Sequence, residues 1–260
     1  MSIILQSRLP FAPWMSPVTA RLPGAQPVVG PWLAVDDAYA GQMTRRDQLI
    51  TEVPQDVLAT LPEGQDAAAE LYAMLLDLLR DMPGFRIGTV EAERPDGQTV
   101  ALDASDPLRT LGRLVQEDLC LMERVGDEQV LTAAALCFPA SWTLAQKLGH
   151  PMMRIHEPVE TYTDDVARRV QRLFDAIRPG QMLWRANALV YDDPTLHQPR
   201  LEGVRRPKSR HGLYLRSERQ SLRRLPLTGA VVFAIHTYVV RMEDLEPEAR
   251  AGLAGAGLLP

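Results

Sequence analysis

Apolar residues recur at helical spacing in three parts of the chain. Leu and Met side chains follow intervals of three and four over residues 64–82, which predicts a helix with one face packed on a core. Residues 163–177 repeat this spacing behind a Thr-Asp-Asp start, a combination typical of a capped helix N-terminus. A third helix is expected over residues 36–49. Proline-glycine pairs directly follow the first two helices and end them.

Alternation of apolar and polar residues predicts strands in much of the remaining chain. Residues 85–104 alternate as expected for two strands around a Pro-Asp-Gly turn, and residues 129–138 have the composition of a buried strand. Between them, Asp106 opens a helix that ends near Glu117 and Asp118. These two could form a metal or proton-relay pair, but adjacent carboxylates on a helix point in different directions, so we expect them to be solvated or to cap. Helices combined with successive strands predict an α+β fold, an antiparallel sheet backed by helices. Three further strands are predicted, at residues 182–191, 212–220 and 229–241.

Both ends of the chain differ from this regular middle. Six prolines in residues 1–35 predict an extended arm over the surface, with Trp14 and Trp32 as its anchors. The last residues are small and apolar and predict a loosely held tail. We therefore divide the chain into an N-terminal arm with a helical extension (1–84), a main domain (85–249) and a tail (250–260).

The composition is that of a folded protein and limits its partners. The 260 residues are 46% hydrophobic and 23% charged, with a formal net charge of −5 and a pI near 5.6, which argues against nucleic-acid binding. The opening lacks the basic start of a signal peptide, and no apolar run is long enough to span a membrane. We therefore expect a cytoplasmic protein.

The sequence carries none of the common electron-transfer motifs. Cys120 and Cys137 are its only cysteines, too few for an iron–sulfur cluster, and their apolar neighbours predict buried thiols. A GxGxxG sequence and a Walker loop are both absent. We therefore expect no FMN, NADPH or iron–sulfur site in this chain.

Residues 137–162 combine aromatic residues, prolines, glycine and two histidines, a composition that favours a pocket wall. Gly149 is expected to end a short helix there, and Pro151 and Pro158 then confine the chain to an irregular path. That path would hold His156 in a fixed position.

Two predicted strands carry an unusual number of polar residues on one face. Alternation places Tyr214, Arg216, Glu218 and Gln220 together on one strand. On the strand at 182–191 it places Arg185, Asn187 and Tyr191 together. If the two faces line one cavity, to which His236 could also contribute, burial would be costly without a ligand or mutual pairing.

Three short motifs carry a family resemblance. They are FPASW at 138–142, IHEPV at 155–159 and LRSERQ at 215–220. On the basis of these motifs, the chain resembles the catalytic alpha subunit of the haem-dependent oxidative N-demethylase family. The further matches cover most of the chain: Trp32-Leu33, residues 36–39, residues 116–119, Arg185, Asn187 and residues 233–238.

The resemblance implies a fold, a cofactor and an activity. Residues 85–249 would form a PAS-like haem-binding domain that holds haem b. The chain would demethylate a small secondary amine with O2 and release formaldehyde. A partner reductase with flavin and an iron–sulfur centre would supply the electrons.

The resemblance also suggests roles for single residues. His156 would ligate the iron, unless it only bonds the backbone in a tight turn; His150, His211 and His236 are the other candidates, and His197 lies in a polar loop and is expected to be solvated. Arginine suits a propionate, so Arg185 and Arg216 would bind the cofactor together with Asn187.

Glu218, with Tyr191, would serve catalysis. The Glu218 carboxylate would hold the substrate ammonium and accept its proton. The alternative is a structural ion pair between Glu218 and Arg216, Arg219 or Arg185.

Two positions depart from the family pattern, and two other functions stay open. Ala188 stands where the family usually has tryptophan, and His236 stands near a usual arginine. A non-catalytic PAS-like protein could use the same pocket to sense haem or another small molecule. A metal-dependent hydrolase using His150, His156 and Glu157 is the third reading, although these residues lack a recognised ligand spacing.

Overall fold

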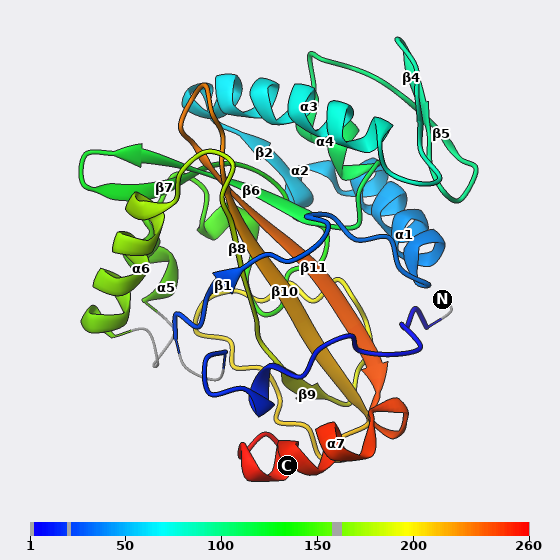
Figure 1. Ribbon diagram of the computed structural model, residues 1–260, viewed down its shortest axis with the longest axis vertical. Helices are drawn as coiled ribbons and strands as arrows, with labels where there is room; N and C mark the ends of the chain where they lie inside the picture. Colours follow the sequence, from blue (N-terminus) through cyan, green and yellow to red (C-terminus); the bar gives the residue numbers. More distant parts are fainter. Residues whose placement is uncertain (1–2, 20–21, 158–162, 260) are drawn as a thin grey trace.

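The protein is built on one antiparallel sheet of eight strands (Figure 1). The computed structural model describes residues 3–19, 22–157 and 163–259. The strand order is β1-β8-β10-β11-β6-β7-β2, and β9 pairs with β10 beyond the end of β8. The predicted α+β fold with an antiparallel sheet is confirmed. The strands are β1 (Gln26–Pro27), β2 (Leu58–Thr60), β6 (Asp118–Val125), β7 (Glu128–Ala135), β8 (Met182–Ala186), β9 (Leu189–Tyr191), β10 (Tyr214–Arg224) and β11 (Val231–Arg241).

A second, small sheet has the order β3-β4-β5. Its strands are β3 (Arg86–Ile87), β4 (Glu91–Glu93) and β5 (Thr99–Ala101). The predicted turn lies between β4 and β5, where the Gly97 amide donates to the Arg94 carbonyl at 2.8 Å. The φ angle of Gly97 is +77°, a conformation that glycine adopts without strain. The segment therefore forms three short strands, one more than its pattern predicts.

Helices cover both faces of the main sheet. On one face, α3 and α4 share a core with Leu119 of β6 and Ala234 of β11. On the other face, α5 and α6 share a core with Cys120 and Met122 of β6, which alternate with the residues of the first core. The helices are α1 (Tyr39–Glu52), α2 (Pro54–Val57), α3 (Gln65–Arg80), α4 (Pro107–Gly112), α5 (Met152–His156), α6 (Asp164–Ala176) and α7 (Pro247–Gly255).

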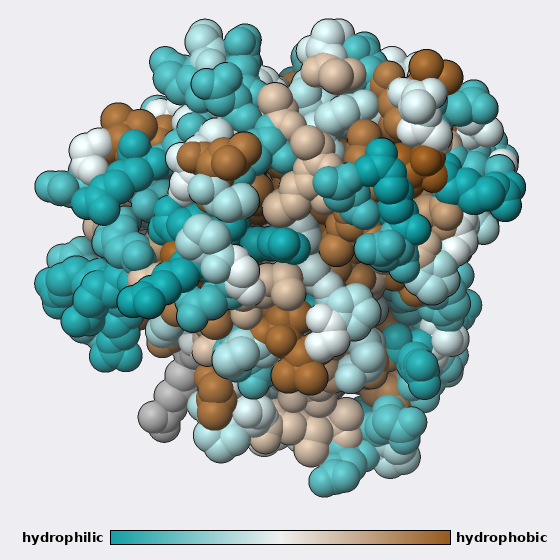
Figure 2. All heavy atoms as spheres, turned by 45° about the horizontal axis from the view of Figure 1, so that its top comes forward, coloured by the Kyte–Doolittle hydropathy of each residue, from teal (hydrophilic) through white to brown (hydrophobic). Residues whose placement is uncertain are grey.

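The helices expected from spacing alone are present. α1, α3 and α6 lie where apolar residues recur every three or four positions, and the Thr163 hydroxyl caps α6 by accepting from the Val166 amide. The outward face of α6 is polar, and Figure 2 shows hydrophilic residues gathered over the side of the molecule that α6 occupies. None of the helices in the described ranges is long and apolar enough to cross a membrane.

The N-terminal arm runs along the sheet and supplies its edges. β1 pairs with β8 at one edge, and β2, from the same first 84 residues, pairs with β7 at the other. The Trp32 indole is buried and donates to the Ser221 hydroxyl of β10 at 2.9 Å. Trp14 donates to the Ala249 carbonyl at 2.8 Å. Both tryptophans therefore anchor the arm.

Three segments differ from their predictions. Residues 247–255 form α7, with Leu253 fully buried against the arm side of the sheet, and not a loosely held tail. Residues 152–156 form the helix α5, and not an irregular path; Pro151 lies at its N-cap, where its missing amide hydrogen costs no helical hydrogen bond. Residues 158–162, which end the predicted pocket wall, lie outside the described residues.

Asp118 is buried at the start of β6, contrary to the expectation of a solvated or capping residue. Its carboxylate accepts from Arg46 at 2.7 Å and from the backbone amides of Cys137 and Phe138 at 2.7 and 2.9 Å. Arg46 is fully buried and also donates to two backbone carbonyls. Asp118 therefore joins α1 to the sheet and to the segment that follows β7.

Replacing Asp118 by alanine should strongly destabilise the protein, because the change leaves a buried arginine charge without its counter-ion. We expect the free energy of unfolding in urea to fall by about 3–5 kcal/mol. Asp127→Ala removes an exposed carboxylate near Arg124 and should leave the urea midpoint unchanged. Equal midpoints for the two variants would contradict the role given to Asp118.

Candidate functional site

A large cavity lies on the sheet face that α5 and α6 cover. Its volume is about 1330 Å³, larger than the ~300–1,000 Å³ of most small-molecule sites. Most of its wall is apolar, with Leu222 and Phe233 on the floor and Val170 and Phe174 of α6 in the cover. The floor residues come from five strands, β6, β7, β8, β10 and β11, because alternate residues on paired strands face the same side.

Polar side chains form one continuous row on this floor. Arg185 of β8 stands opposite Gln220 of β10 and donates to its side-chain oxygen at 2.7 Å. The side-chain amide of Gln220 donates to Oε2 of Glu218 at 2.9 Å, and the side-chain amide of Asn187 donates to the same oxygen at 2.9 Å. The predicted meeting of Arg185, Asn187 and Glu218 is therefore found, with Gln220 as the link.

Asn187 occupies a break in the strand that the sequence predicts as continuous. β8 ends at Ala186 and β9 begins at Leu189. Across the break, the Asn187 side-chain oxygen accepts a hydrogen bond from the backbone amide of Glu218 at 2.9 Å. The backbone amide of Asn187 donates to the backbone carbonyl of Glu218 at 3.2 Å. The asparagine side chain thus takes the place of a backbone group in the ladder and is held rigidly.

Arg185 is the cation of this row. Burial lowers the pKa of Arg185, and the charge of Glu218 opposes this shift. Within the described ranges, its buried Nε has no hydrogen-bond partner, and none of its nitrogens forms an ion pair. A buried guanidinium with unused donor capacity is a place where an anionic group of a ligand can bind.

His156 reaches the same cavity from α5. Its Nδ1 lies 2.9 Å from the Met152 carbonyl, which can only accept, so Nδ1 carries the proton. Burial lowers the pKa of His156, and the nearby charges of Lys147 and Arg185 lower it further. The imidazole is therefore neutral near pH 7. The backbone hydrogen bond that was the alternative to iron ligation is present, and it is compatible with ligation through Nε2.

Two other predicted site residues do not line the cavity. Arg216 lies on the cavity side of β10, but its guanidinium donates to the Leu196 and Phe138 carbonyls at 2.8 and 2.7 Å. Tyr191 is buried beyond the strand break, with the Arg206 guanidinium 4.1 Å from its ring centre. Both side chains support the loop that follows β9.

The remaining histidines lie outside the cavity. His150 and His211 are exposed. His197, expected to be solvated, is half-buried, with Nδ1 2.8 Å from the Cys137 carbonyl. His236 is fully buried on the opposite face of the sheet, so the expectation that it could share the polar cavity is wrong.

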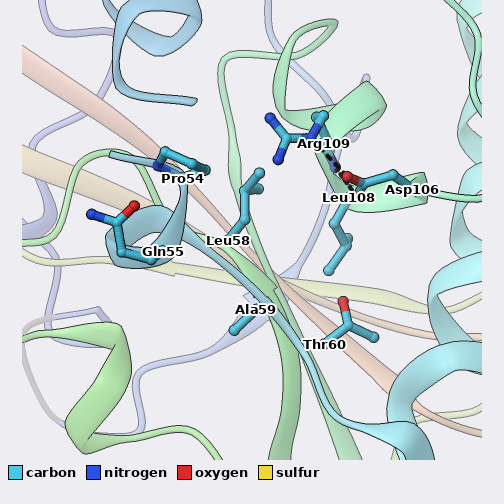
Figure 3. Close-up of a pocket in the computed structure, with 8 residues that line it drawn as sticks. All are labelled: Pro54, Gln55, Leu58, Ala59, Thr60, Asp106, Leu108 and Arg109. Carbon is cyan, nitrogen blue, oxygen red and sulfur yellow. Dashed lines mark hydrogen bonds and ion pairs between the residues drawn. The ribbon is translucent and has the colours of Figure 1, made fainter. Parts of the chain in front are cut away.

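A smaller pocket lies at the free edge of β2 (Figure 3). Its volume is about 330 Å³. Arg109 in its wall donates from Nε to Oδ2 of Asp106 at 2.7 Å and also donates to the Ile50 carbonyl. Because this arginine is already paired, the larger cavity is the stronger candidate for a functional site.

A family model described as haem-dependent oxidative N-demethylase, alpha subunit-like, matches residues 26–256. The chain belongs to this family. The match covers the whole cavity floor and the two motifs that contain His156 and Glu218.

The cavity of this family member fits haem chemically. It combines a large apolar volume, a neutral imidazole and a buried guanidinium with unused capacity for a carboxylate. These are the groups that a flat apolar ring, its iron and a propionate require. Among the described residues, no three His, Cys, Asp or Glu side chains gather to hold a lone metal ion.

Behind the cavity floor lies a charge cluster that the sequence does not reveal. His236 lies between two carboxylates, with Nε2 3.0 Å from Asp36 and Nδ1 3.0 Å from Glu117. Glu117 also accepts from the Ala34 amide at 2.9 Å, so it is neither solvated nor a helix cap. Asp36 and Ala34 belong to the arm, and the cluster therefore fixes the arm to β11.

The cluster should make stability depend on pH. Burial lowers the pKa of His236, but hydrogen bonds and charges from Asp36 and Glu117 outweigh it and raise the value to about 9, against 6.5 ordinarily. Because the pKa of His236 is higher in the folded protein than in the unfolded chain, protonated His236 stabilises the fold fully below pH 6.5. This contribution disappears as pH rises through about 9. The whole loss corresponds to roughly 3 kcal/mol.

Urea titrations of wild type and His236→Gln at several pH values test this. The difference in unfolding free energy between the two proteins should shrink between pH 6.5 and 9. The exposed His150→Gln variant should follow the wild type throughout. A difference independent of pH would show that His236 is neutral in the folded protein.

Proposed function

We propose that this chain is the catalytic subunit of a haem-dependent oxidative N-demethylase acting on a small secondary amine. The reaction would convert the N-methyl amine, O2, two electrons and two protons into the demethylated amine, formaldehyde and water. The observation that carries the proposal is the row of Glu218, Gln220 and Arg185 on the floor of a large apolar cavity that His156 also lines. Family membership supports the same reaction.

His156 and Arg185 are the residues we propose to hold haem b. The Nδ1 hydrogen bond of His156 to Met152 fixes the ring in the tautomer whose Nε2 has a lone pair for iron. Arg185 would bind a propionate, because its Nε is buried and unbonded within the described chain. When bound, haem supplies the activation of O2 for oxidation of the methyl group.

Glu218 is the residue we propose to hold the substrate. Its side chain is 11% exposed and belongs to the cavity lining, so a carboxylate is presented to a mostly apolar space. A protonated amine would be bound by charge and hydrogen bond, and the carboxylate would take its proton when the neutral amine is needed. Apolar walls would exclude water from the methyl group.

Electrons would come from a separate reductase with flavin and an iron–sulfur centre. Cys120 and Cys137 are both buried, and burial raises the pKa of the Cys137 thiol to about 12. Such inert thiols favour an external electron donor. The family's description as an alpha subunit agrees with partner proteins.

Replacing His156 by alanine should remove or shift the Soret band of the haem-loaded protein. The exposed His150→Ala variant is the matched control and should keep the wild-type spectrum in air and after dithionite. A wild-type Soret band in His156→Ala would exclude His156 as the ligand. A wild-type protein without any Soret band after expression with haem precursor would exclude the haem function itself.

Replacing Glu218 by glutamine should abolish demethylation and leave the haem spectrum intact. The glutamine keeps the size of the side chain but lacks the charge and the basicity, and we expect a loss of about 10²–10⁴-fold in formaldehyde release. Glu243→Gln, an exposed change outside the cavity, is the control. Full activity in Glu218→Gln would give Glu218 a structural role.

The sensor hypothesis predicts a different result for the same wild-type protein. A sensor would bind haem and O2 and would consume no amine. Formaldehyde release that requires amine, O2 and a chemical or protein reductant therefore separates the two functions.

A further inference from the structure

Gln220 makes two hydrogen bonds whose directions are determined by chemistry. Arginine has no acceptor, so the 2.7 Å contact with Arg185 must be to the side-chain oxygen of Gln220. A carboxylate has no donor, so the 2.9 Å contact with Glu218 must come from the Gln220 amide nitrogen. Gln220 therefore cannot rotate its amide without losing both bonds.

The two oxygens of Glu218 are consequently unequal. Oε2 accepts from Gln220 and from Asn187, both at 2.9 Å, which uses both of its lone pairs. The nearest cation to Oε1 is Arg216, whose Nε lies 3.9 Å away, too far for a hydrogen bond. Within the residues that the structure describes, no hydrogen bond to Oε1 is found.

We propose that Gln220 is a positioning residue that holds Oε2 of Glu218 so that Oε1 receives the N–H of a small methylated ammonium ion. This inference rests on the proposed function. The neighbours of Gln220 and Leu222 on β11 are Ile235 and Phe233, which are apolar and line the same cavity. The substrate is therefore a cation with at least one N–H donor and with methyl groups that contact apolar side chains.

The position of Gln220 also connects substrate and cofactor binding. The same amide contacts the arginine that we assign to a propionate and the carboxylate that we assign to the amine. A change at Gln220 should therefore alter amine affinity more than haem affinity, because Arg185 keeps further donors for a propionate.

The test compares Gln220→Met with wild type, both haem-loaded and full-length. Methionine has a similar length and makes neither bond, so the Glu218 carboxylate becomes free to rotate. We expect calorimetric titration with dimethylammonium to show about ten- to hundredfold weaker binding, with KM raised and the Soret band unchanged. Tetramethylammonium, which has no N–H, should bind both proteins equally weakly.

Gln220→Glu gives an independent readout, the pH profile of kcat/KM, which a merely structural role of Gln220 would not change. It keeps the contact with Arg185 and places a second carboxylate beside Oε2, so the two acids should share a proton. The acidic limb of the kcat/KM profile should then move to higher pH. Gln171→Met on α6, outside the cavity lining, is the control for both measurements.

The outcomes separate the two proposals. Wild-type affinity and an unchanged pH profile in both Gln220 variants would overturn the role of Gln220 alone. A wild-type protein that binds no dimethylammonium would overturn the proposed function, and the assignment of Gln220 with it. Melting curves of the variants identify any loss of binding that comes from unfolding, and Gln220→Glu, which retains the Arg185 contact, then decides the question.

Discussion

The antiparallel ladder between β10 and β11 is the constraint on which the rest of the structure depends. The two strands pair continuously over eleven residues, from Tyr214 opposite Arg241 to Arg224 opposite Val231. Because side chains alternate, Glu218 and Gln220 face the cavity, whereas Arg219 faces the opposite side and donates to the Trp32 carbonyl of the arm. A slip of one residue would exchange these two sets, so the long ladder and the apolar layers on both sides fix the chemistry of the site.

The buried cations of the sheet differ in whether they have a charged partner. On the face opposite the cavity, His236 lies between Asp36 and Glu117, and at the start of β6 Arg46 is paired with Asp118. On the cavity face, Arg185 contacts only the neutral amide of Gln220 among the described side chains. Burying a cation beside a neutral partner is costly unless a ligand supplies the missing anion. The missing charged partner of Arg185, more than the size of the cavity, indicates where a ligand binds.

Local periodicity in the sequence predicts individual helices and the two faces of individual strands. The polar face of β10 and the helices α1, α3 and α6 follow from spacing alone. Spacing also puts Arg185 and Glu218 on polar strand faces, but only the structure shows that these faces line one cavity, with Gln220 between the two residues. Long-range partners do not follow from it. His236 and Asp36 are separated by 200 positions, and Arg216 has the strand parity expected of a cavity residue, yet backbone carbonyls of the loop after β9 take its donors. The short edge strand β2 lacks any periodic signal, because three residues are too few to show alternation.

The rigidity of the site follows from the same arrangement. Glu218 and Gln220 lie on a central strand, where a functional side chain can be held more accurately than on a loop. Directly behind them, the arm is fixed to β10 through Trp32 and to β11 through the His236 cluster. The arm therefore closes the back of the strands whose front binds the ligand. His236 therefore stays outside the cavity lining and still holds the arm against β11, the strand paired with the one that carries Glu218 and Gln220.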